Sequence, residues 1–107
     1  MKICVTSEGK TLDSKVDPRF GRCANFIIID TESGEFEALE NANIKLQGGA
    51  GIQSAQMVAS KGVKAVLTGN VGPNAQQTLS AAGIRICTGI SGTIKDAVEA
   101  FKTEKAE

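Results

Sequence analysis

The side chains best suited to chemistry are concentrated in residues 17–23, which read DPRFGRC. This stretch holds a proline, a phenylalanine and a cysteine, in a chain that has only two Pro, four Phe and three Cys. Arg19 and Arg22 can each direct a fork of N–H donors at an anion. Cys23 can ligate a soft metal as its thiolate. The stretch is therefore a candidate ligand-binding loop.

The same residues also have structural roles open to them. Arg19 and Arg22 could form surface salt bridges with acidic neighbours such as Asp17. Phe20 is expected to plug the core at the end of a sheet rather than to stack on a ligand. Asp17, which precedes a proline, is expected to form a turn. Cys23 could equally be a small buried hydrophobic residue.

The cysteine and histidine content limits the chemistry further. The three cysteines, Cys4, Cys23 and Cys87, are odd in number and irregularly spaced, which does not suit a disulfide framework. Cys4 is expected to be buried, whereas for Cys23 and Cys87 both a buried structural role and a metal-ligating role are open. The chain contains no histidine. This removes the commonest general base, histidine-activated nucleophiles and histidine zinc sites.

Three glycine-rich segments each precede an expected helix: GGAG at 48–51, GNVGPN at 69–74 and GISGT at 89–93. Helix N-termini present unpaired N–H groups and partial positive charge, and glycine lets a ligand approach the backbone. The candidate binding residues here are Gly48, Gly49, Gly51, Gly69, Asn70, Gly72, Ser91 and Gly92. None of the segments has the spacing of a dinucleotide or P-loop motif, so ordinary turn chemistry is the alternative for any one of them.

The hydrophobic pattern predicts eight elements in the order β-β-β-α-β-α-β-α. Strands are expected at residues 2–6, 24–31, 35–40, 64–69 and 84–89, and helices follow the three glycine-rich segments. Gly62 and Gly83 end the first two helices. Thr93 and Asp96 have the spacing of a capping box for the third. The expected loop at 41–51 is polar at its start and glycine-rich at its end.

This order predicts an α/β fold with one mixed five-stranded sheet. The alternation of strands and helices in the second half implies parallel strands, and the first half implies antiparallel ones. The loops at 7–22, 41–51, 69–74 and 88–92 then gather at one edge of the sheet. Open α/β sheets bind ligands at that edge. We therefore expect an anion-receiving surface there.

Length and composition predict one domain, residues 1–103, with a solvated tail at 104–107. A chain of 107 residues can fold without a metal or a disulfide. Its net charge of zero gives no overall attraction to nucleic acid or to an anionic membrane. The apolar runs are too short to span a bilayer, and no signal peptide is evident. The expected location is the cytoplasm.

The chain resembles the dinitrogenase iron–molybdenum cofactor biosynthesis family. The resemblance is carried by MKICVTS at the start, DPRFGRCANFIIID at 17–30, GGAGIQSAQ at 48–56, GVKAVLTGNVGPNA at 62–75, AGI at 82–84 and SGTIKDAVE at 91–99. It implies a three-layer, ribonuclease-H-like fold. It also implies a non-enzymatic role, in which the protein binds or carries an iron–sulfur or molybdenum-containing cluster and meets a cofactor-assembly protein.

Carried over to this chain, the resemblance makes Arg19, Phe20, Gly21 and Arg22 the signature loop and places Gly48, Gly49 and Gly51 on its facing side. Some family members have a histidine where this chain has Arg19. Without histidine, either Cys23 and Cys87 ligate the cluster, or the anionic cluster is captured electrostatically.

Two functions from other classes remain as alternatives. The same glycine-rich edge could serve a phosphate- or nucleotide-binding regulatory module, or a plain interaction module that regulates a partner. A two-metal nuclease is rejected. The strands expected at 2–6, 64–68 and 84–87 carry no Asp or Glu to hold the metals.

Overall fold

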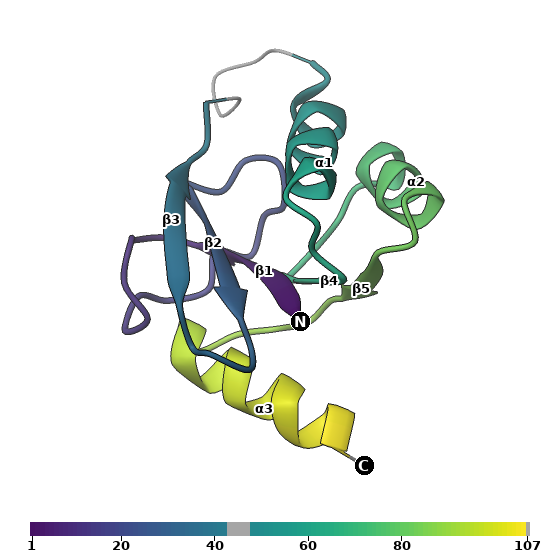
Figure 1. The fold of residues 1–107 in the computed structure, drawn as a ribbon. Coiled ribbons are helices and arrows are strands. Elements are labelled where there is room, and N and C mark those ends of the chain that lie inside the picture. Colours follow the sequence, from purple (N-terminus) through teal and green to yellow (C-terminus); the bar gives the residue numbers. More distant parts are fainter. Residues whose placement is uncertain (43–47, 107) are drawn as a thin grey trace.

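The computed structural model describes residues 1–42 and 48–106 (Figure 1). Its elements are β1 (Lys2–Ser7), β2 (Asn25–Asp30), β3 (Phe36–Glu40), α1 (Ala50–Ser60), β4 (Ala65–Leu67), α2 (Pro73–Ala81), β5 (Arg85–Cys87) and α3 (Ile94–Ala106). This is the succession that the hydrophobic pattern predicts. Residues 43–47, in the middle of the expected polar loop, and residue 107, at the end of the expected tail, lie outside the described residues.

The strands form one mixed sheet in the order β3-β2-β1-β4-β5. Strand β2 is antiparallel to both β1 and β3, and β4 is parallel to both β1 and β5. The β2–β3 hairpin turns at Asp30, whose carboxylate accepts the N–H groups of Glu32 and Ser33. The carboxyl ends of β1, β4 and β5 therefore meet at one edge of the sheet, where the candidate loops were expected.

Helices cover the sheet on both faces, which makes three layers. On one face, Cys4, Phe26 and Val66 pack with residues of α1 and α2. On the other face, a second core that includes Val5 and Leu67 packs against α3. Figure 1 shows α1 and α2 side by side, with α3 on the far side of the strands. Alternate residues of each central strand thus supply two separate cores, as the two-residue period of a strand requires.

Helix α3 crosses the boundary that was expected between domain and tail. It continues to Ala106, and Glu104 forms an ion pair of 2.7 Å with Arg85 on β5. Residues 104–106 of the expected tail therefore belong to the helix, and Glu104 is exposed. In the described part of the chain, no helix is long and apolar enough to cross a membrane.

Replacing Thr93 with alanine should destabilise the protein by about 1 kcal/mol. The Thr93 hydroxyl accepts the N–H of Asp96 at 3.1 Å, which caps the first turn of α3. Urea unfolding measures the loss. The matched control is Thr103→Ala, because Thr103 lies later in the same helix and its hydroxyl only donates to the carbonyl of Glu99. Equal losses in the two variants would contradict a stabilising cap.

Candidate functional site

A pocket with a volume of about 270 Å³ opens at the edge of the sheet where the first turns of α1 and α2 meet. Its walls are residues 20–22 of the loop that precedes β2, residues 49–52 at the start of α1 and residues 72–75 at the start of α2. We extend the name signature loop from residues 19–22 to residues 17–24. Three segments that are far apart in the sequence therefore build a single pocket.

The first turns of α1 and α2 offer hydrogen-bond donors to this pocket. The leading N–H groups of a helix have no acceptor within the helix. Neither N-cap residue, Gly49 or Gly72, supplies a side-chain cap. Partial positive charge at the two helix ends adds to the full charge of Arg22, which also lines the pocket. Together these groups favour an anion.

Two glycines allow the signature loop and the helices to come this close. Gly21 has φ of +89°, and a Cβ atom there would lie 3.0 Å from the Cα atom of Gly51 in α1. A Cβ atom on Gly51 would in turn lie 3.2 Å from the Cβ atom of Ala75 in α2. Side chains at either position would press apart the three segments that form the pocket walls.

The two arginines of the signature loop are placed differently. Arg19 does not line the pocket. Its Nε lies 3.3 Å from Oδ1 of Asp17, and its Nη2 lies 3.5 Å from Oδ2 of the same residue. Hydrogen bonding to the Asp17 carboxylate, together with its negative charge, raises the pKa of the Arg19 guanidinium. Of the two arginines expected to face a ligand, Arg22 alone belongs to the pocket wall.

A second hollow, with a volume of about 300 Å³, lies near the β2–β3 turn and is poorly suited to binding an anion. Its lining includes the carboxylates of Asp30, Glu35 and Glu37, with Lys2 as the one basic residue among the described residues there. A site dominated by negative charge repels anions. Of these two hollows, the pocket at the helix N-termini is the better suited to an anion, and we take it as the candidate functional site.

Comparison with known proteins identifies the family of the chain. The sequence model of a family described as dinitrogenase iron–molybdenum cofactor matches residues 1–104. The chain belongs to this family. An uncharacterised relative from Methanocaldococcus jannaschii is 32% identical over 98 residues, which cover 89% of this chain and 83% of the relative.

Two solved structures show the shared fold. The apo form of the orange protein from Desulfovibrio gigas matches with a TM-score of 0.94 and 43% identity, covering 97% of this chain and 88% of that one. A Thermotoga protein of the DUF35 family, provisionally named a NifB protein, matches with a TM-score of 0.83 and 41% identity, covering 95% and 87%. The resemblance drawn from the sequence is thus confirmed at the level of the family.

Gly69 and Asn70 support the signature loop without lining the pocket, whereas Phe20 does both. Asn70 donates its N–H to the carbonyl of Pro18 at 2.7 Å, and its own carbonyl accepts the N–H of Phe20 at 3.1 Å. A Cβ atom on Gly69 would lie 2.7 Å from Pro18. Phe20 is buried and contacts Phe26 edge-on, with the ring centroids 5.8 Å apart, while also forming one pocket wall. The prediction of Phe20 as a core plug is confirmed.

Three other candidates lie away from the pocket. Gly48 is exposed and is not part of the pocket wall. Ser91 lines a separate hollow beside α3, and the carbonyl of Gly92 accepts the N–H of Val16. The chain reaches α3 after β5 by crossing to the opposite face of the sheet, so the third glycine-rich segment serves the other layer. The third glycine-rich segment therefore lies at the expected edge, beside Thr68 and Gly69, but it does not line this pocket.

The two candidate thiols lie on opposite faces of the sheet. Cys23 is fully buried with Cys4 in the core beneath α1 and α2, whereas Cys87 packs at the border of the α3 core. Burial, reinforced by the charge of Asp17, raises the pKa of Cys23 to about 12. Among the described residues, no group of three or more His, Cys, Asp or Glu side chains is arranged to hold a metal. The structure thus does not bring Cys23 and Cys87 together as a ligand set.

Replacing Cys23 with serine should leave anion binding within about twofold of wild type while lowering stability by about 1–3 kcal/mol, because a hydroxyl is costly in an apolar site. Urea unfolding and an anion titration of the folded variant separate the two effects. Cys87→Ser is the control, because it makes the same change at a half-buried thiol. Loss of binding with little loss of stability at Cys23 would instead indicate ligation.

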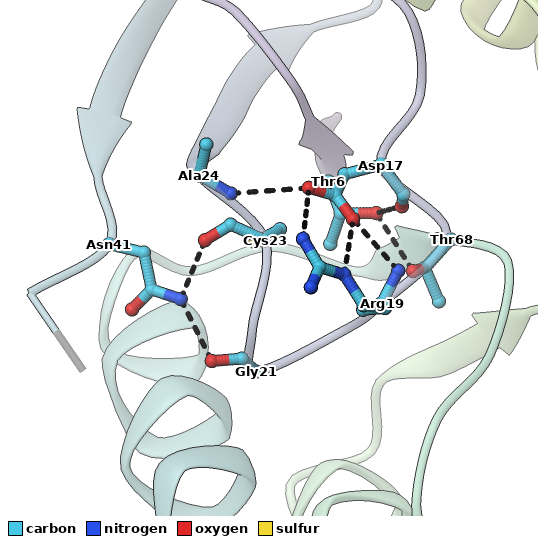
Figure 2. A network of polar contacts seen from close by, with 8 residues as sticks. All are labelled: Thr6, Asp17, Arg19, Gly21, Cys23, Ala24, Asn41 and Thr68. Carbon is cyan, nitrogen blue, oxygen red and sulfur yellow. Dashed lines mark hydrogen bonds and ion pairs between the residues drawn. The ribbon is translucent and has the colours of Figure 1, made fainter. Parts of the chain in front are cut away.

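Sequence reasoning missed the polar side chains that hold the signature loop (Figure 2). Asp17 was expected to form a turn, and Asn41, Thr6 and Thr68 were not singled out. Thr6 Oγ1 lies 2.6 Å from the carbonyl oxygen of Asp17 and 2.8 Å from Oγ1 of Thr68. Polar residues at the ends of strands β1, β3 and β4 were the available signal, but only the fold shows which of them meet.

Proposed function

We propose that this protein is a non-enzymatic cytoplasmic carrier that holds an anionic metal–sulfur cluster, containing iron or molybdenum, in the pocket between the signature loop and the two helix N-termini. One observation carries the proposal. The uncapped N-termini of α1 and α2 converge with Arg22 on one pocket beside the loop that marks the family. Such a site stabilises negative charge.

The composition of the pocket wall indicates how the cargo is held. None of the described residues that line it is Cys, His, Asp or Glu. A cluster bound there would keep its own ligands, since the wall offers N–H donors and a guanidinium instead of metal ligands. Sulfide atoms accept hydrogen bonds from such donors. A cargo held without a coordinate bond can be passed to an assembly protein, which suits a carrier.

The family and the fold support the same proposal. The family is described by the iron–molybdenum cofactor, and the orange protein of Desulfovibrio gigas and the NifB-named Thermotoga protein share the fold. We also propose that the fold is ribonuclease-H-like. It is supported by the antiparallel β2 within the order β3-β2-β1-β4-β5 and by helices on both faces.

Titration with tetrathiomolybdate tests the proposal. We expect saturable binding, a change in the visible spectrum, and shifts of the amide resonances of Gly51, Ile52 and Asn74, at both helix N-termini. Sulfate, which carries the same charge without sulfide, serves as the control and should bind more weakly. A response of these amides to a nucleotide but not to the thiometallate would favour the phosphate-binding alternative and overturn the carrier proposal.

A further inference from the structure

Two buried side chains, Asp17 and Asn41, form hydrogen bonds with backbone groups of the signature loop. We propose that these two are positioning residues for the pocket. Asp17 accepts hydrogen bonds from backbone N–H groups of the loop, and Asn41 donates hydrogen bonds to the carbonyl oxygens of Gly21 and Cys23. The loop is thereby fixed with these two carbonyl oxygens turned away from a bound anion. The inference rests on the proposed function, because it concerns how the same pocket stays receptive to negative charge.

Asp17 holds the two ends of the loop. Its Oδ1 accepts the N–H of Arg19 at 3.1 Å, and its Oδ2 accepts the N–H of Ala24 at 3.3 Å. The side chain is only 3% exposed, and its backbone is tied to the end of β1, where its N–H donates to the carbonyl of Thr6 at 2.9 Å. A buried acceptor on a rigid strand end thus spans the loop from residue 19 to residue 24.

Asn41 holds the middle of the loop from the opposite side (Figure 2). Its Nδ2 donates to the carbonyl oxygens of Gly21 at 2.8 Å and Cys23 at 2.9 Å. The residue is 6% exposed, follows β3 directly, and is anchored by its N–H to the carbonyl of Ala24 at 3.0 Å. Two carbonyl oxygens that would repel an anion are therefore occupied by a side chain outside the pocket wall.

The hydrogen bonds of Asp17 and Asn41 hold the signature loop in the conformation that forms the pocket. Gly21 must keep its positive φ and its contact with Gly51 for the loop to close against α1. Restraints on residues 19, 21, 23 and 24 leave the loop little freedom, so less ordering is required when an anion binds. Arg19 then has a distinct role: its guanidinium offsets the negative charge of Asp17 beside a site meant for anions.

The sign of one mutational effect tests the inference. Asp17→Asn removes a negative charge near the pocket, so simple electrostatics predicts tighter binding of tetrathiomolybdate. Positioning predicts the reverse, because Asn has one acceptor oxygen in place of two and its NH₂ group only donates, so one of the two bonds from the N–H groups of Arg19 and Ala24 is lost. We expect binding at least about tenfold weaker. Asp13→Asn is the matched control, since it removes the same charge from an exposed loop residue and should change the affinity by less than about twofold.

A second variant keeps the test decisive if Asp17→Asn does not fold. Asn41→Ala changes no charge, and it should also weaken thiometallate binding about tenfold while leaving the dependence on salt unchanged. Gln77→Ala, at an exposed position of α2, is its control. Wild-type affinity in Asn41→Ala, or tighter binding in Asp17→Asn, would overturn the inference.

A measurement without any anion separates this inference from the proposed function. In the ligand-free variants that fold, the amide resonances of both Gly21 and Gly51 should move, although Gly51 belongs to α1. Failure of the wild-type protein to bind thiometallate would refute the carrier proposal alone. Unchanged Gly21 and Gly51 resonances in both variants would refute the positioning role, whatever the wild type binds.

Discussion

Replacing Gly21 with alanine is expected to remove detectable thiometallate binding and to lower the free energy of unfolding by about 3 kcal/mol. The residue has φ of +89°, which costs an L-residue about 1–2 kcal/mol. The new methyl group would also sit 3.0 Å from the Cα atom of Gly51, so the loop and α1 must separate at a further cost of about 1–3 kcal/mol. Urea unfolding and a thiometallate titration measure the two losses.

Gly34→Ala is the matched control for this variant. Gly34 has a similar φ of +78°, but a Cβ atom there would meet nothing within 4 Å. Its substitution should cost only the backbone term of about 1–2 kcal/mol and leave binding intact. If the two variants lost equal stability and bound equally well, the close approach of the loop to α1 would not be needed for the pocket.

Replacing Arg22 with glutamine is expected to weaken thiometallate binding by about 10- to 100-fold, which corresponds to one hydrogen bond to a charged group. Arg22 lines the pocket and carries a full positive charge, whereas Arg19 is not among the residues that line it. The affinity should also depend less on salt, because screening acts on the charge that has been removed. Titrations at two ionic strengths measure both effects.

The control is Arg85→Gln, which removes the same charge from β5. Arg85 pairs with the exposed Glu104 and lies over the ring of Phe101, on the α3 face of the sheet. A purely global effect of net charge would weaken binding equally in both variants, and that result would contradict a direct role for Arg22.

The separation of the two arginines has a physical basis. Asp17 is two residues from Arg19 and is buried, so pairing with it satisfies a carboxylate that would otherwise be costly in the interior. Arg22 lies beyond Gly21, on the part of the loop that faces the helices. Arg19 and Arg22 therefore have different roles, because the fold places Arg19 beside Asp17 and Arg22 beside the helices.

The sequence by itself determined the local elements and the edge at which they meet. The continuous β-branched run in FIIID, the glycines that end helices and the strand–helix alternation are local signals, and the structure contains the elements that they predict. The family was also readable from the sequence, since its motifs are continuous stretches such as RFGR and GGAG. The burial of Cys4 and of Phe20 and the helix cap at Thr93 were also predictable, because each depends on neighbouring residues in the sequence.

Only the tertiary structure decided which residues form the pocket. Ser91 and Gly92 were predicted with the other glycine segments, yet the crossing of the chain to α3 places them in another layer. Cys23 and Cys87 are each near the sheet edge but on opposite faces, which spacing along the chain does not reveal. The roles of Asp17 and Asn41 depend on hydrogen bonds across 7 and 18–20 residues. Such contacts arise from the packing of the loop between strands and helices, so they cannot be predicted from the local sequence pattern.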